Sequence, residues 1–197
     1  MSTEKPLIRA NMKEFLDRLT PDERHRRSVE ACAQLAATPQ FRQAQLIMLF
    51  LSMPGEIETS TLALKAWAEG KSLAVPRVDW EAKHMVPVEI NSLDTGLATG
   101  KYGLREPSKG KVVPLDLIDM IVVPGLAFDR HGFRVGRGRG FYDRFLAQQD
   151  FQGTRCALCF HEQLISGIPL EPHDIPMDLI VTDREVVHCA QARPVTR

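Results

Sequence analysis

The chain has 197 residues, of which 44% are hydrophobic and 25% charged, and its formal net charge at pH 7 is zero. This length favours a single domain with a sizeable core. Zero net charge argues against a dedicated nucleic-acid binder, which is usually basic. No apolar run approaches the roughly 20 residues of a membrane span, and the first residues lack a signal-peptide core. We therefore expect a cytoplasmic protein without nucleic-acid or membrane partners, with one domain over 1–197 and a polar tail from about 189.

The first part of the chain predicts two helices. Apolar residues at helical spacing predict an amphipathic helix over 6–19. A second helix begins after Thr20, because Thr-Pro-Asp-Glu supplies a cap, a proline at the first position and an acid at the third. Lys5 and Arg9 are four residues apart, so both can project from one side of the first helix. By composition alone, this pair is a solvated helix face.

A buried strand is predicted at 46–51 and is ended by Met-Pro-Gly. Glu56 and Glu58 follow it, where ligands bind in open α/β sheets. A helix starting near Thr59 then runs to Glu69, with Gly70 as its stop.

Short strands are predicted at 73–76 and 84–90, and a glycine-broken loop over 91–107. Tyr102 in that loop is either a wall for a flat heterocycle or an ordinary packed aromatic. Further strands are predicted at 117–123, 155–160 and 178–182. Strands that alternate with helices predict a three-layer, Rossmann-like α/β fold, whose mostly parallel central sheet carries helices on both faces.

The four cysteines predict neither a redox nor a zinc site. Cys156 and Cys159 form a CxxC pattern, but they lie within a predicted strand, where residues three apart point to opposite faces. A second Cys/His pair at zinc spacing is absent from the sequence. We therefore expect reduced core cysteines.

The segment IVVPGLAFDRHGFRVGRGRGFYDRF, residues 121–145, carries the chemistry. A buried strand is followed by arginines interleaved with glycines and then by a helix start at Phe141. Glycines let backbone N–H groups converge on an oxyanion, a helix start adds donors, and arginine fits phosphate bidentately. Asp143 adds a carboxylate of the kind that holds Mg²⁺ together with substrate phosphates. The pattern is neither GxGxxG nor a Walker loop, so a solvated basic loop or an RGG-like nucleic-acid contact stays open.

The sequence PGLAFDRHGFRVGRGRGFYDRFL closely resembles the signature of the 5-formyltetrahydrofolate cyclo-ligase family. Lys5-x-x-x-Arg9 and LSMPGEIET, residues 51–59, match the same family in the same order, so the resemblance covers nearly the whole chain. It implies an ATP- and Mg²⁺-dependent ligase that cyclises 5-formyltetrahydrofolate to 5,10-methenyltetrahydrofolate. We expect a monomer that binds only small molecules, including polyglutamylated forms of the substrate.

The resemblance also implies site residues. For ATP these are Lys5, Arg9, Arg134, Val135, Gly136, Arg137, Gly138, Arg139, Gly140, Phe141 and Tyr142. For the folate they are Leu51, Glu56, Arg137, Gly138, Arg139, Gly140 and Phe141. Asp143 and Asp178 would hold Mg²⁺, and Arg137 and Arg139 would stabilise charge in the reaction. Relatives often carry Lys or Gly at the position of Arg139.

Two other classes of function remain possible from the sequence. A relative of this family can keep the fold and bind folate or nucleotide without turnover, because a fold does not fix a function. An RNA-binding protein could use the Arg/Gly loop with Phe141 and Tyr142 stacking on bases, although neutral charge disfavours it.

Overall fold

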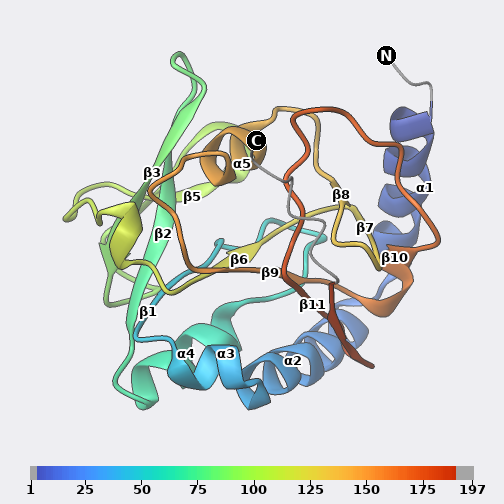
Figure 1. Cartoon of the computed structure of the whole chain (residues 1–197). Coiled ribbons are helices and arrows are strands. Elements are labelled where there is room, and N and C mark those ends of the chain that lie inside the picture. The colour runs from blue at the N-terminus through green and yellow to red at the C-terminus, as the bar shows by residue number, and fades with distance from the viewer. Residues whose placement is uncertain (1–3, 190–197) are drawn as a thin grey trace.

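The computed structural model describes residues 4–189, and its centre is a seven-stranded sheet in the order β12-β11-β9-β6-β1-β2-β3 (Figure 1). The five inner strands run parallel, and an antiparallel strand, β12 or β3, closes each edge. The predicted mostly parallel sheet is confirmed. Its strands are β1 (Leu46–Met48), β2 (Ser72–Asp79), β3 (His84–Ile90), β6 (Met120–Val123), β9 (Thr154–Leu158), β11 (Leu179–Val181) and β12 (Val186–His188).

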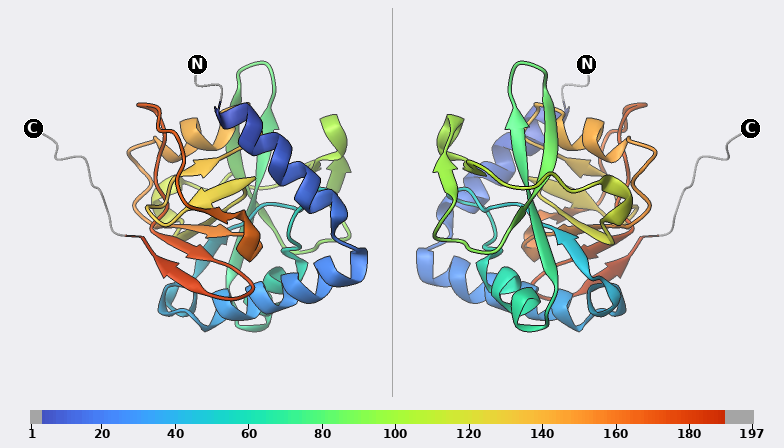
Figure 2. Two further views of the ribbon diagram at one scale, coloured as in Figure 1. Left: turned by 90° about the vertical axis from the view of Figure 1, so that its right-hand side faces the viewer. Right: turned by 90° about the vertical axis from the view of Figure 1, so that its left-hand side faces the viewer.

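Helices cover both faces of this sheet, as the sequence predicts. Figure 1 shows α2 (Pro21–Ala37), α3 (Pro39–Gln43) and α4 (Ser60–Ala68) along one face and α5 (Phe141–Leu146) on the other. The α1 helix (Glu4–Arg18) stands at the side, across the smaller sheet described below (Figure 2). The structure adds α3, which the sequence analysis did not predict.

The strand pattern explains why both faces must be covered. In β6, Met120 and Val122 join the core beneath α2 and α4, whereas Ile121 and Val123 join the core beneath α5. All four side chains are fully buried, as expected for a strand covered on both faces. A charge in this strand would have no route to water on either side.

The CxxC pattern follows the same alternation. Cys156 packs in the core beneath α2, whereas Cys159 packs in the core on the opposite face. Both thiols are reduced and buried, and burial raises the pKa of each above its usual value. The prediction of core cysteines is confirmed.

A second, three-stranded sheet lies against α1 and consists of β7 (Ala127–Asp129), β8 (Arg134–Val135) and β10 (Leu164–Ile165). The sequence predicts that the β6 strand leads directly into the glycine-rich turn, and this prediction is wrong, because the β7–β8 hairpin intervenes. Gly125 allows the chain to fold back, since a Cβ there would lie 2.5 Å from the Phe128 ring. The hairpin thereby carries the glycine-rich segment away from the end of β6.

Local signals place most helix boundaries. The Thr20 side chain accepts a hydrogen bond from the backbone N–H of Glu23 at 3.2 Å and caps α2, and Gly70, at φ +75°, follows the end of α4.

The prediction of a loop over 91–107 is wrong, because β4 (Leu97–Thr99) and β5 (Arg105–Pro107) form a hairpin around the short 3₁₀ turn Lys101–Gly103. Other 3₁₀ turns are Leu115–Leu117 and His161–Gln163.

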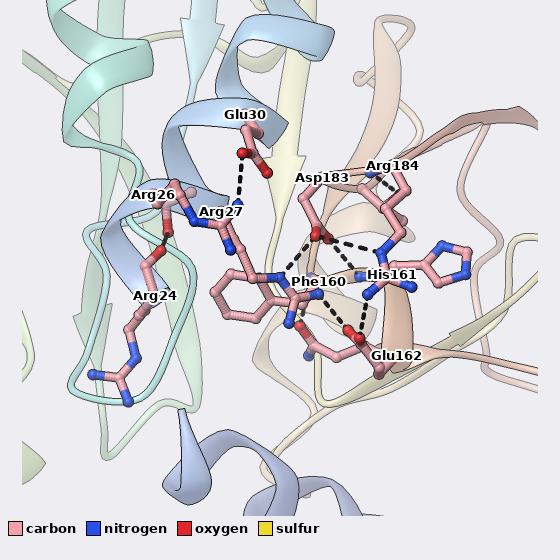
Figure 3. Close-up of polar contacts among 12 residues, drawn as sticks. Arg24, Arg26, Arg27, Glu30, Phe160, His161, Glu162, Asp183 and Arg184 are labelled. Atoms are coloured by element: carbon pink, nitrogen blue, oxygen red, sulfur yellow. Dashed lines mark hydrogen bonds and ion pairs between the residues drawn. The ribbon is translucent and has the colours of Figure 1, made fainter. Parts of the chain in front are cut away.

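A buried ion cluster ties α2 to the loops that follow β9 and β11 (Figure 3). Arg27 Nε donates to Asp183 at 2.7 Å, and its Nη2 pairs with Glu162. The Arg27 guanidinium also lies 5.0 Å from the centre of the Phe160 ring. Because the Asp183 side chain is only 3% exposed, its charge depends on Arg27 for compensation.

Most of the polar tail predicted from about 189 lies outside the described residues, although Cys189 itself is buried. The domain limits stay a prediction. None of the helices within 4–189 combines the length and the apolar character that a membrane span requires. The cellular compartment expected above is not tested by this finding.

Candidate active site

The strand order of the sheet reverses between β1 and β6. From β1 the chain adds β2 and β3 on one side, and from β6 it adds β9, β11 and β12 on the other. β1 pairs with β2 on one side and with β6 on the other, so the loops that leave the carboxyl ends of β1 and β6 diverge. In open α/β sheets, ligands bind in the crevice at such a point. The loop after β1 carries Leu51 and Glu56, and the glycine-rich segment 136–140 meets that loop through the contacts described next.

An ion pair joins the two stretches. Arg137 Nε and Nη2 each lie 2.9 Å from the same Glu56 oxygen, Oε1, and the second Glu56 oxygen accepts the backbone N–H of Met53 at 3.0 Å. Arg9 of α1 donates from Nε to the Gly136 carbonyl at 2.9 Å. The first helix, the loop after β1 and the glycine-rich segment therefore converge.

Glycine is required within this segment for conformational reasons. Gly138 and Gly140 adopt φ values of +91° and +65°, a region in which side chains are strained. A Cβ at Gly136 would lie 2.9 Å from Arg134 Nη1. Val135, which the family resemblance assigns to ATP, is 1% exposed and packs in the small core beneath α1, so its side chain supports the segment from behind.

Arg134 lies beneath the segment and pairs with Asp143 of α5. Burial lowers the pKa of Arg134, and the Asp143 carboxylate opposes that effect. Arg134 Nε and the Tyr142 hydroxyl are buried and have no hydrogen-bond partner within residues 4–189. Burial raises the pKa of Tyr142, so its hydroxyl stays protonated. Two buried donors beside the glycine-rich segment thus lack a partner within the described residues.

Lys5 has partners of its own. Its Nζ donates to Glu171 at 3.0 Å and to Asp174 at 2.8 Å. Burial acts to lower the pKa of Lys5, but the two hydrogen bonds outweigh it, and the pKa lies above its usual value. Lys5 and Arg9, although one helical turn apart, therefore have different partners, and the prediction that both close over one nucleotide stays a prediction.

The two predicted metal carboxylates occupy different environments. Asp143 Oδ1 is bonded to Arg134, and Oδ2 makes no hydrogen bond inside the described part of the chain. Asp178 Oδ2 accepts the backbone N–H of Arg155 at 2.8 Å, at the amino-terminal ends of β9 and β11. Since Glu56 follows the carboxyl end of a parallel strand, Asp178 lies at the opposite end of the sheet from it.

An aromatic cluster lies beside the glycine-rich segment, and only part of it, Tyr102 and Phe141, is predicted from the sequence. The Trp80 ring, at the tip of the β2–β3 hairpin, lies 5.3 Å from the Tyr102 ring and 5.2 Å from the Phe141 ring, measured between centroids. The Arg139 guanidinium lies 4.4 Å from the Tyr102 centroid and 5.5 Å from that of Trp80. Trp80 carried no motif, so its place here came only from the structure.

Comparison with known proteins identifies similar chains. The model of the 5-formyltetrahydrofolate cyclo-ligase family matches residues 1–183. The 5-formyltetrahydrofolate cyclo-ligase of Mus musculus is 31% identical, over 92% of this chain and 94% of its own, and that of Escherichia coli K12 is 30% identical, over 85% and 94%. The NMR structure of Aquifex aeolicus 5,10-methenyltetrahydrofolate synthetase superposes with a TM-score of 0.83 at 28% identity, covering 98% of this chain and 96% of that one.

Proposed function

Because the chain belongs to the 5-formyltetrahydrofolate cyclo-ligase family, we propose that it cyclises 5-formyltetrahydrofolate to 5,10-methenyltetrahydrofolate, consumes Mg-ATP and releases ADP and phosphate. The formyl oxygen is a poor leaving group. Transfer of the γ-phosphoryl group to that oxygen gives an iminium phosphate. The neighbouring folate amine then attacks the formyl carbon and loses its proton to solvent, and phosphate leaves as the ring closes. The protein mainly has to position two ligands and neutralise charge.

The Glu56–Arg137 ion pair is the observation that carries this proposal. It joins residues 81 positions apart in the sequence, one from the stretch matched to folate binding and the other from the stretch matched to phosphate binding. A folate seated on the first and a nucleotide seated on the second would therefore have adjacent reactive groups. Such adjacency is what a two-substrate transfer needs.

Glu56 and Leu51 are proposed to hold the folate. One Glu56 oxygen accepts the Nε–H of Arg137 and lies equally close to its Nη2, both at 2.9 Å. A carboxylate with this capacity can accept the paired N–H groups on a pterin edge. Leu51, 7% exposed in the core beneath α2, would form an apolar wall. Binding would then release Arg137 from Glu56 toward the transferring group, where we place its catalytic contribution together with Arg139.

The nucleotide phosphates are proposed to lie on the Gly136–Gly140 backbone. Arg134 and Tyr142 offer their unpartnered buried donors, and Arg9 supports the segment through the Gly136 carbonyl. A ligand oxygen that reached these donors would recover hydrogen bonds that they lack within residues 4–189. Lys5 remains a candidate only if it leaves Glu171 and Asp174.

Asp143 fits the requirements of Mg²⁺. Its carboxylate is a hard oxygen donor at the edge of the proposed phosphate site and has one oxygen not hydrogen-bonded within the described chain, and Mg²⁺ is commonly held by one or two carboxylates plus substrate phosphates. The ion would neutralise phosphate charge during transfer. Asp178 is retained as a second ligand only as a prediction, given its position at the amino-terminal ends of β9 and β11.

The test is to mix the purified protein with Mg-ATP and 5-formyltetrahydrofolate and to follow the near-ultraviolet absorbance of the methenyl product. We expect product that requires ATP and a divalent ion, and equal amounts of phosphate and product. Arg130→Ala is the matched control for Arg139→Ala, because Arg130 lies in the same segment but forms an exposed pair with Glu185. Binding of both ligands without product would identify a non-catalytic relative instead.

A further inference from the structure

Arg139 differs from the other arginines around the glycine-rich segment. Arg9 is bonded to the Gly136 carbonyl, Arg134 to Asp143 and Arg137 to Glu56. Within residues 4–189, the Arg139 guanidinium makes no hydrogen bond or ion pair. Its contacts are with the faces of two rings, Tyr102 at 4.4 Å and Trp80 at 5.5 Å.

Stacking and hydrogen bonding use different parts of a guanidinium. The flat face meets an aromatic ring, whereas the N–H donors radiate in the plane of the group. A guanidinium whose contacts are with ring faces therefore keeps its N–H donors available. Arg134 also lies over a ring, that of Tyr142 at 5.8 Å, but it is paired with Asp143. Among the four arginines, Arg139 is the one whose whole guanidinium is free of hydrogen bonds and ion pairs within residues 4–189, so all of its N–H donors can receive an oxyanion.

The local backbone does not hold this side chain in place. Arg139 is exposed and lies between Gly138 and Gly140, both at positive φ, and a long side chain on such a backbone has many rotamers to lose when it binds a ligand. The Trp80 and Tyr102 rings restrict the rotamers of Arg139 before a ligand binds. Trp80 is itself supported by an edge-to-face contact with Phe141, at 5.2 Å and 79°.

We propose that Trp80 and Tyr102 are positioning residues, which hold the Arg139 guanidinium over their rings so that its N–H donors receive an anionic oxygen of a substrate. This inference rests on the proposed function and deepens it. Two groups have the required chemistry, a phosphate of the nucleotide and a glutamate carboxylate of the folate. Arginine suits this arrangement better than lysine, whose ammonium has no flat face and no in-plane fork.

The kinetic test is a double-mutant cycle. Trp80→Leu should weaken the apparent affinity for one substrate about 2–5-fold, the effect of a partly exposed cation–π contact, and Trp80→Phe should recover most of it because a ring remains. In an Arg139→Ala background, Trp80→Leu should have no further effect. An equal effect in both backgrounds would overturn the proposal, because the rings would then act on the substrate and not on the arginine.

The two anion sources are distinguished by which Michaelis constant changes. A rise in KM for ATP identifies a phosphate. A rise in KM for 5-formyltetrahydrofolate, without a rise for an analogue that lacks the glutamate, identifies the carboxylate. A rise for both the folate and that analogue would contradict an oxyanion contact.

A spectroscopic test separates this proposal from the reaction itself. The chain has two tryptophans, so Trp67→Phe leaves Trp80 as the reporter. Addition of inorganic triphosphate or of glutamylated folate should change its emission, and Arg139→Ala should abolish that change. If the protein made no methenyl product but kept this response, the proposed function would fail and the positioning role would stand. A response unaffected by Arg139→Ala would overturn the positioning role.

Discussion

Replacement of Arg27 by alanine should destabilise the protein far more than the same change at its neighbour Arg26. Arg27 is 7% exposed in its side chain and compensates Asp183, which is 3% exposed. Without Arg27, the Asp183 carboxylate stays buried with backbone N–H donors, that of His161 at 2.8 Å among them, and with the more distant Arg184 Nε at 3.9 Å. Breaking a buried pair in this way costs about 3–5 kcal/mol. Arg26 forms an exposed i,i+4 pair with Glu30, worth about 0.3–0.5 kcal/mol.

The measurement is urea unfolding followed by circular dichroism at pH 7. In a thermal scan, a loss of about 3–5 kcal/mol should lower Tm by roughly 6–20 °C, since about 1 kcal/mol corresponds to 2–4 °C for a chain of this size. Joint replacement, Arg27→Met with Asp183→Asn, should recover much of the loss because no buried charge then remains. Equal costs for Arg27→Ala and Arg26→Ala would refute the reasoning.

The same pair predicts a dependence on pH. Burial acts to raise the pKa of Asp183, but hydrogen bonding to Arg27 outweighs it and holds the pKa below its usual value. A depressed folded-state pKa contributes stability above the unfolded value, about 3.9, and that contribution is lost as pH falls through the folded value. The difference in free energy of unfolding between the wild-type protein and Arg27→Ala should therefore be largest at pH 7 and should decrease below about pH 4.

Three further outcomes are expected. Asp143→Asn should reduce Mg-ATP turnover by at least tenfold. It should also lower the free energy of unfolding by about 1–3 kcal/mol, because the buried charge of Arg134 is then less well compensated. Full activity across a Mg²⁺ titration would contradict the metal assignment. Glu56→Gln should raise KM for the folate about tenfold, the loss of one charge-assisted hydrogen bond, and affect KM for ATP much less; equal changes would count against a pterin contact. The advantage of the wild-type protein over Lys5→Met should be present below about pH 10.4 and fade as pH rises through the raised folded-state pKa, as measured by urea unfolding from pH 8 to 11.

The features predicted correctly from the sequence depend on neighbours close in the chain. The Thr20 cap bonds three residues ahead, Gly70 ends α4 through its own φ, and Cys156 and Cys159 separate through strand alternation. The parallel sheet followed from the order of strands and helices. Each of these follows from backbone geometry or side-chain periodicity within a few residues.

The features missed depend on partners far apart in the chain. β7 pairs with β10 across more than 30 residues, and its short strand carries no clear alternation. Arg27 finds Asp183 156 positions away, and within its helix it resembles any other arginine. Trp80, at the tip of the β2–β3 hairpin, meets Arg139, which lies 59 positions further along the chain, and no local pattern encodes that contact. The site residues matched by family resemblance, the monomeric state and the absence of nucleic-acid partners stay predictions.

The two ends of α1 are held by different contacts, and this difference affects how ligands enter and leave. Its carboxyl end is anchored by Leu16, in the main core, whereas its amino half rests on the smaller sheet and is tied through Lys5 and Arg9. The amino half can therefore detach as a local unit, without opening the main sheet, once a few polar contacts break. Amide hydrogens in the first turns of α1 should then exchange with solvent at a much smaller free energy than those of α2. Ligand binding at the site should slow that exchange, so the exchange rate of α1 amides would report on ligand binding.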